Sequence, residues 1–324
     1  MEGKKQLKHF VLVHGVCHGA WCWYRLQSLL EMEGHRVTAI DLAASGTNPK
    51  KLDELRTFSD YTQPLFEVME SIPPHEKVVL VGHSLGGMNM AFAMEKYPDK
   101  ISVAVFITAI MPDTVHRPSY FMEQGMKNSS EEDSMDNQIF PFGKPEDHLV
   151  AMLFGPQYTS SKLYQLCPYE DVVLAKELMR PGCTFLEDLS KQSAFTDERY
   201  GSIKRAYIIP AQDKTIKIEF QRWLIENAGA AIVKEIKDAD HMAMISKPHE
   251  LCQYLLDIAW EGKGPRPCAT EDFIALSLPQ SLLKEVWHDM GRGDATSHHV
   301  YHPIYILILF LIFILISLLF YFKF

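Results

Sequence analysis

The chain has 324 residues, of which 47% are hydrophobic, and its formal net charge is −9. This length suits one large core with an insertion rather than two independent domains. A negative chain without a basic run is not expected to bind nucleic acid. The six cysteines show no C-x-x-C pair, and the first residues lead directly into a strand without a signal-peptide region, so we expect a cytoplasmic protein with reduced thiols.

Short apolar runs alternate with amphipathic helical patterns through residues 1–111. We expect strands over 9–13, 36–42, 78–81 and 101–111, and helices over 21–34, 58–72 and 87–97. Strands that are almost wholly apolar and are followed by helices are typical of a mainly parallel sheet covered on both faces.

The alternation stops between residues 112 and 202, where prolines, methionines and aromatic residues are frequent and only 170–179 has a clear helical pattern. A structureless loop of this length is uncommon in a compact domain. We therefore expect an inserted cap over 112–202, between core segments 1–111 and 203–261. The core pattern resumes with strands over 204–210 and 231–236 and helices over 218–228 and 248–260.

A different kind of sequence follows the last core helix. Residues 262–303 are a polar connector, and residues 304–322 carry no charge. As a helix, the second segment would be about 29 Å long, enough to cross the hydrocarbon core of a membrane. We interpret it either as a transmembrane tail anchor or as an extension from an unusual or mis-spliced transcript. The nearby histidines His298, His299 and His302 lack carboxylate or thiolate neighbours, so we expect an interfacial role or none, and no metal site.

The sequence VVLVGHSLGGM, residues 78–88, contains the central motif of the chain. A G-x-S-x-G segment between a buried strand and a helix is a nucleophile elbow, which presents the serine hydroxyl above the sheet. The motif needs glycines because the strand and helix backbones pass close to each other at the turn. The flanking elements favour a nucleophilic Ser84 over an incidental serine in a glycine-rich turn.

A serine nucleophile needs a base and an acid that orients the base. In this architecture the chain order is Ser, Asp or Glu, then His. Asp213 and His241 each follow a predicted core strand, so both should lie at the sheet edge that binds ligands in open α/β folds. Asp238 and Asp240 are alternative carboxylates, but they are too close in sequence to His241 to reach its Nδ1 readily. We therefore predict Asp213 as the acid.

The loop after the first strand offers the second group of site residues. The backbone N–H of Val16 can converge with that of Leu85 on one oxygen, which would form an oxyanion hole. His14 and His18 in the same loop are either additional acid–base groups or residues that hold the loop by hydrogen bonds. We favour the second interpretation.

Several stretches of the chain resemble the plant methylesterase family, which includes salicylate-binding-type esterases and polyneuridine aldehyde esterases. They are HFVLVHGVCHGAWCWY, VTAIDLAASGTNP, VGHSLGGMNMAFAMEKYP, VFITAIMPD, ERYGSIKRAYI, EFQRW and KEIKDADHMAMISKP. The resemblance covers about residues 8–260 and implies a cofactor-free, cytoplasmic serine carboxylesterase that acts on methyl esters of small plant acids, such as phytohormones or alkaloid acids. It carries the triad onto Ser84, Asp213 and His241. The family ends near residue 262, so the remaining residues depart from its pattern.

Two alternative functions remain open. Hydroxynitrile lyases resemble this chain but have threonine at the position of Gly15 and lysine at that of Met242. Because such a lyase needs a fixed cation to hold departing cyanide, the thioether of Met242 favours an esterase. The other alternative is a hormone-binding receptor on the hydrolase fold with little turnover, for which product affinity would far exceed substrate affinity.

We therefore predict an α/β-hydrolase fold with a mainly parallel sheet, an inserted cap and a C-terminal hydrophobic tail. The pocket is expected to be apolar, with Gly15, Met242 and the cap residue Met152 in its lining. No cofactor and no metal are expected. The expected partners are a small-molecule methyl ester, a membrane through the tail, and a second copy of the chain in a homodimer.

Overall fold

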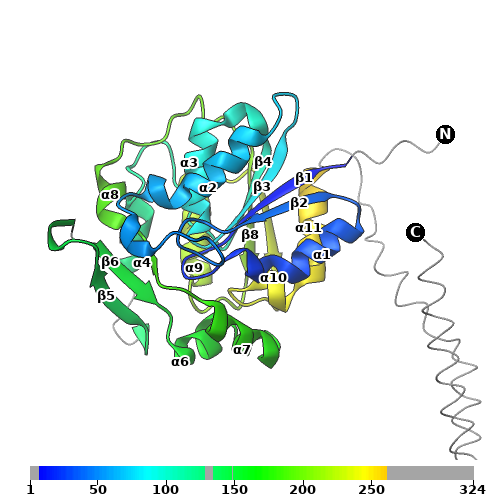
Figure 1. Cartoon of the computed structure of the whole chain (residues 1–324). Coiled ribbons are helices and arrows are strands. Elements are labelled where there is room, and N and C mark those ends of the chain that lie inside the picture. Colours follow the sequence, from blue (N-terminus) through cyan, green and yellow to red (C-terminus); the bar gives the residue numbers. More distant parts are fainter. Residues whose placement is uncertain (1–6, 128–133, 148, 261–324) are drawn as a thin grey trace, which may run out of the picture. The chain divides into compact units, whose positions relative to one another are not determined.

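The computed structural model describes residues 7–127, 134–147 and 149–260 (Figure 1). The chain divides into two compact units, Met1–Cys268 and Ala269–Phe324, of which the second lies wholly outside the described residues. The predicted connector over 262–303, the apolar tail over 304–322 and the histidine cluster lie outside them too. Among the described residues, no helix is both long and apolar enough to cross a membrane.

A six-stranded sheet forms the centre of the first unit. Its order is β2-β1-β3-β4-β8-β9, and every neighbouring pair is parallel. The strands are β1 (His9–Val13), β2 (Arg36–Ile40), β3 (Val78–His83), β4 (Ile101–Ile107), β8 (Arg205–Pro210) and β9 (Ile232–Ile236). The predicted parallel sheet is confirmed.

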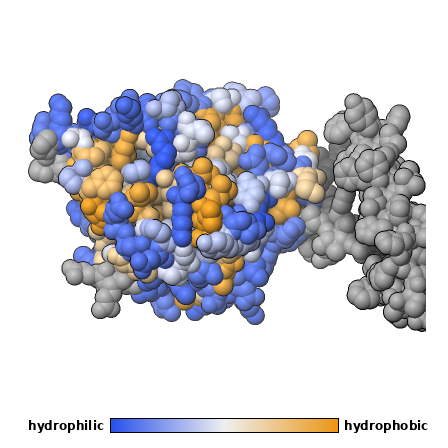
Figure 2. Space-filling model, turned by 60° about the horizontal axis from the view of Figure 1, so that its bottom comes forward, coloured by the Kyte–Doolittle hydropathy of each residue, from blue (hydrophilic) through white to orange (hydrophobic). Residues whose placement is uncertain are grey.

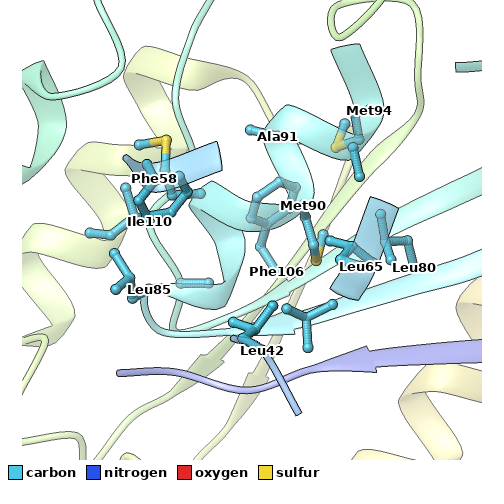
Figure 3. Close-up of a cluster of buried hydrophobic side chains, with 14 of the residues drawn as sticks. Leu42, Phe58, Leu65, Leu80, Leu85, Met90, Ala91, Met94, Phe106 and Ile110 are labelled. Carbon is cyan, nitrogen blue, oxygen red and sulfur yellow. The ribbon is translucent and has the colours of Figure 1, made fainter. Parts of the chain in front are cut away.

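Helices cover both faces of this sheet because its central strands are apolar on both sides. In β1, Val11 and Val13 join one buried cluster with residues of α2, α3 and α9, whereas Phe10 and Leu12 join a second cluster with residues of α1, α10 and α11. Figure 3 shows part of the first cluster, including Met90 of α3. The helices are α1 (Tyr24–Met32), α2 (Phe58–Ser71), α3 (Gly86–Lys96), α9 (Ile218–Ala228), α10 (Ala243–Ser246) and α11 (Pro248–Ala259).

Some core elements are shorter than predicted. β2 ends at Ile40 because the Asp41 carboxylate then accepts the N–H groups of Ala20 at 2.7 Å and Thr47 at 2.9 Å, which turns the chain into a loop. β4 ends at Ile107, where Thr108 takes a left-handed conformation with φ +37°. The predicted helix over 21–34 is a 3₁₀ turn, Ala20–Trp23, followed by α1. Further 3₁₀ turns are Leu52–Glu54, Pro98–Lys100 and Pro145–Asp147.

Between β4 and β8 the chain forms a small antiparallel sheet and short helices, here called the β4–β8 segment. The sheet has the order β5-β6-β7. The elements are α4 (Tyr120–Lys127), β5 (Gln138–Phe142), β6 (Leu149–Leu153), α6 (Pro156–Tyr158), a π-helical turn Thr159–Leu163, α7 (Tyr169–Leu178), β7 (Gly182–Cys183) and α8 (Leu186–Lys191). The sequence predicted only α7. Figure 2 shows the face that carries α6 and α7, with hydrophobic residues in separate areas among hydrophilic ones.

Candidate active site

Ser84 lies in the turn between β3 and α3 and is partly buried. Its φ is +54°, a left-handed conformation that strains a residue with a Cβ atom. Two backbone hydrogen bonds hold this turn: the Ser84 carbonyl accepts the N–H groups of Gly87 at 3.2 Å and Ile110 at 3.0 Å. A Cβ atom at Gly86 would lie 2.6 Å from the carbonyl oxygens of Val13 and His14, so only glycine fits there. The strain and the close packing are those expected of a nucleophile elbow.

His241 is paired with Asp213 at the same edge of the sheet. The His241 Nδ1 lies 2.8 Å from Asp213 Oδ2, and the side chains are 2% and 0% exposed. Since a carboxylate only accepts, Nδ1–H is the donor and the Nε2 atom of a neutral ring is left unprotonated. The other carboxylate oxygen, Oδ1, accepts the N–H groups of Thr215 at 2.7 Å and Ile216 at 2.9 Å. Asp213 is therefore fixed independently of the histidine that it orients.

The preference for Asp213 over the other two carboxylates agrees with the structure. Asp238 is exposed. Asp240 is buried, but it accepts the N–H groups of Leu166 at 2.8 Å and Met242 at 3.1 Å. Burial raises the pKa of the Asp240 carboxyl above its usual value. Asp240 thus holds the β4–β8 segment, whereas Asp213 holds His241.

Thr108 supports the pair and was not anticipated from the sequence. It is fully buried directly after β4, and its hydroxyl donates to Asp213 Oδ2 at 2.5 Å. A polar residue that interrupts the apolar run ISVAVFITAIM at the same sheet edge was the available signal. Thr108 and His241 together saturate the Asp213 oxygen that faces the site.

His83, the residue before the nucleophile, is a second unanticipated contributor. Its Nε2–H donates to the His241 carbonyl oxygen at 2.8 Å, and the two ring centroids are 4.5 Å apart. Burial holds the pKa of His83 well below its usual value, so this ring is neutral. His83 therefore fixes the backbone that carries His241.

His14 and His18 hold the first loop by hydrogen bonds, as predicted. His14 Nδ1–H donates to the Gly15 carbonyl at 2.7 Å, and its Nε2 accepts the Leu42 N–H at 3.1 Å. His18 Nδ1–H donates to the Val16 carbonyl at 2.9 Å. Burial lowers the pKa of His14 to about 4 and that of His18 to about 3, so both rings are neutral near pH 7.

The first loop packs directly against the nucleophile elbow. A Cβ atom at Gly15 would lie 2.8 Å from Ser84 Cβ, and Gly86 lies against the His14 carbonyl. Val16 follows Gly15 in sequence and Leu85 precedes Gly86, so the two predicted oxyanion donors belong to backbone segments in contact.

The three predicted pocket residues have different surroundings. Gly15 lies against Ser84, as described above. Met152, in β6, is half-buried, and its carbonyl accepts the Cys17 thiol at 3.3 Å. Met242 is fully buried in the second hydrophobic cluster. Within residues 7–127, 134–147 and 149–260, no group of three or more His, Cys, Asp or Glu side chains could hold a metal ion.

The model of the alpha/beta hydrolase family matches residues 10–254, and the chain belongs to this class of proteins. Salicylic acid-binding protein 2 of Nicotiana tabacum is 58% identical over 79% of this chain and 98% of its own length. Polyneuridine aldehyde esterase of Rauvolfia serpentina is 55% identical over 79% of this chain and 97% of its own length. A crystal structure of polyneuridine aldehyde esterase superposes with a TM-score of 0.77 at 55% identity, covering 78% of this chain and 100% of that one. Within its class, the chain is a member of the plant methylesterase family and a carboxylic ester hydrolase.

Proposed function

We propose that this chain hydrolyses methyl esters of small plant acids through an acyl-enzyme on Ser84. The observation that carries the proposal is the buried Asp213–His241 pair, 2.8 Å apart, at the sheet edge where the strained Ser84 turn also lies. Relatives named as a salicylic acid-binding protein and as an aldehyde esterase support a small plant metabolite as the acyl part.

In the proposed mechanism, His241 Nε2 takes the proton of the Ser84 hydroxyl as its oxygen attacks the ester carbonyl. Asp213 keeps the ring in the Nδ1–H form and stabilises the imidazolium that develops. The N–H groups of Val16 and Leu85 donate to the carbonyl oxygen as it gains negative charge. The His241 imidazolium then gives its proton to the departing methoxide, which leaves as methanol. With His241 again as base, a water molecule attacks the acyl-enzyme, which releases the free acid and restores the Ser84 hydroxyl. No cofactor takes part in these steps.

We also propose that residues 112–202 act as a cap and that Gly15, Met152 and Met242 line the pocket. The contact between Met152 and Cys17 supports this role, because it joins β6 to the loop that lies against Ser84. Among the described residues, Cys17, Cys22, Cys167 and Cys183 form no disulfide, which supports a reducing compartment such as the cytoplasm.

The environment of Met242 argues against the lyase alternative. The lyase relatives place a lysine at this position, whereas Met242 is 0% exposed among apolar residues. A Cβ atom at Gly15, as in the threonine of those relatives, would also come within 2.8 Å of Ser84 Cβ. An ester hydrolase needs neither the cation nor the threonine.

A panel of methyl esters tests the proposal. The full chain should release equal amounts of acid and methanol from at least one of methyl salicylate, methyl jasmonate and methyl indole-acetate, measured by chromatography. Cleavage of mandelonitrile without ester turnover would establish the lyase instead. Tight binding of a free acid by calorimetry, without turnover of any ester, would establish a receptor.

The membrane anchor over 304–322 and the homodimer remain predictions from the sequence. Truncation after Gly262 should leave kcat/KM unchanged, because α11 closes the described unit near Ala259. The full chain should sediment with membranes and resist extraction by high salt. A full chain that stays in the soluble fraction contradicts the anchor, and a monomer in light scattering contradicts the homodimer.

A further inference from the structure

Tyr164 connects the β4–β8 segment to the loop that carries Val16. It follows the π-helical turn Thr159–Leu163, and its N–H bonds back to the Thr159 carbonyl at 2.9 Å. π-Helical turns are rare and occur often at functional sites. The Tyr164 side chain is buried, its hydroxyl lies 2.8 Å from His18 Nε2, and the two rings are within 14° of parallel.

The Val16 carbonyl fixes the direction of the two hydrogen bonds that the His18 ring makes, one to Val16 and one to Tyr164. The Val16 carbonyl can only accept, so His18 carries its proton on Nδ1. His18 Nε2 is therefore a lone-pair acceptor, to which the Tyr164 hydroxyl donates. Donation to Nε2 polarises the imidazole and strengthens the Nδ1–H bond to Val16. Without the hydroxyl, a buried acceptor would lose its partner.

The orientation of the Val16 N–H depends on the two peptide planes that meet at this residue. His14 holds the Gly15 carbonyl, which shares a plane with the Val16 N–H, and His18 holds the Val16 carbonyl in the next plane. His14 is in turn fixed by Leu42 of the core, whereas His18 is fixed by Tyr164. One of the two supports of this predicted oxyanion donor thus comes from the β4–β8 segment.

We infer that Tyr164 is a positioning residue of the esterase reaction, which acts through His18 to aim the Val16 N–H at the developing oxyanion. The inference rests on the proposed function. It gives the β4–β8 segment a part in the chemical step beyond covering a pocket.

Tyr164→Phe removes the hydroxyl and keeps the ring. We expect kcat for p-nitrophenyl acetate to fall about 10-fold with KM within about twofold, since removing an oxyanion donor outright costs roughly 10²–10³ in kcat and misalignment costs less. Tyr24→Phe is the matched control: its hydroxyl also joins the core to the β4–β8 segment, but it donates to Asp171 at 2.6 Å and not to His18. This control should leave kcat unchanged.

His18→Asn tests whether Tyr164 acts through His18. An asparagine places an amide N–H where Nδ1–H was and has no atom at the position of Nε2. In the His18→Asn background, Tyr164→Phe should therefore have no further effect on kcat. The same loss in both backgrounds, a change in KM alone, or an unchanged kcat in the single variant would overturn the inference.

A spectroscopic measurement separates this inference from the proposed function. Histidine ¹⁵N NMR of the full chain, assigned by comparison with His18→Asn, should show His18 in the Nδ1–H form, whatever the substrate. An Nε2–H form overturns the positioning role. A wild-type chain that turns over no ester overturns the proposed function instead.

Discussion

The central sheet and the β4–β8 segment both contribute to the candidate site, but the sheet strands are buried more completely than those of the segment. Strands such as β3 are buried over their whole length, so hydrophobic burial on two faces fixes their position. The strands β5 and β6 carry exposed or half-buried residues along most of their length. The segment buries side chains such as Phe185 and Tyr164 in the two hydrophobic clusters, and it adds individual polar contacts with the core to this packing.

Two sets of these polar contacts are centred on Asp171 and Arg180. Asp171 of α7 accepts the Tyr24 hydroxyl at 2.6 Å and the Arg25 guanidinium at 2.7 Å. Arg180 donates to backbone carbonyls of a core loop, including those of Gly46 at 3.0 Å and Asn48 at 2.9 Å. The Asp171 carboxylate is buried, so it would be left unpaired without Tyr24 and Arg25. The comparison teaches that chemistry should be most sensitive to substitutions in the core and at Tyr164, which contacts the first loop, whereas substitutions at Asp171 and Arg180 should mainly change stability.

The largest expected effect is a difference in kcat between variants of two buried aspartates, Asp213 and Asp240. Asp213→Asn should lower kcat by about 10⁴, because the amide no longer selects the Nδ1–H form of His241. Asp240→Asn should leave kcat within a few-fold, because Asp240 contacts Leu166 and Met242 rather than the ring. Steady-state kinetics of both variants on one ester checks the difference. Equal losses in the two variants would contradict the assignment.

The next effect is on stability and concerns Asp171, which joins the β4–β8 segment to Tyr24 and Arg25 of the core. Asp171→Ala should destabilise the chain by about 2–3 kcal/mol, because it leaves the Tyr24 hydroxyl and the Arg25 guanidinium without their partner. Chemical denaturation gives this value, and kcat should change little. Glu187→Ala, which removes the exposed pair with Lys191, is the control and should not change stability. A large loss of kcat in Asp171→Ala would contradict the claim that the Asp171 contacts stabilise the fold without affecting the chemical step.

Acid should weaken the fold through the buried histidines. Their pKa values, about 4 for His14 and about 3 for His18, lie below the value of about 6.5 in an unfolded chain. The unfolded state therefore binds more protons below pH 6.5, and stability is lost as pH falls towards the folded values. Between pH 7 and pH 5 each histidine should cost about 2 kcal/mol.

The variant His18→Asn isolates one histidine of this pair. Its unfolding free energy, measured in urea at pH 7 and pH 5, should fall by about 2 kcal/mol less than that of the wild type. An identical pH dependence in the two chains would show that His18 is not buried in the neutral form.

The smallest effect compares two caps on the same helix. The first turn of α2 is capped by its own Thr57, whose side chain accepts the Asp60 N–H at 3.0 Å, and by Asp188 of α8, which accepts the Phe58 N–H at 2.9 Å. Thr57→Ala and Asp188→Ala should each cost about 1 kcal/mol, measured by thermal unfolding. An additive double variant would show that the local and the long-range cap act independently, whereas strong coupling would contradict this.

The contrast between the central sheet and the β4–β8 segment also explains which elements the sequence could predict. Buried strands and the helices that follow them leave a periodic pattern, so the elements around Ser84, Asp213 and His241 were found within a few residues. The strands β5 and β6 leave no such pattern, and β7 has only two residues. Thr108 and His83 act through partners more than 100 residues away, at Asp213 and His241, and no local pattern reports such contacts.

The most direct test of the claim that Ser84 is the catalytic nucleophile is to remove its hydroxyl. Ser84→Ala should lower kcat for a methyl ester by about 10⁴ or more and leave the circular dichroism spectrum unchanged, because the hydroxyl is not part of the buried core. Retention of more than a few per cent of wild-type kcat by a folded Ser84→Ala chain would contradict the assignment of this turn as the catalytic centre.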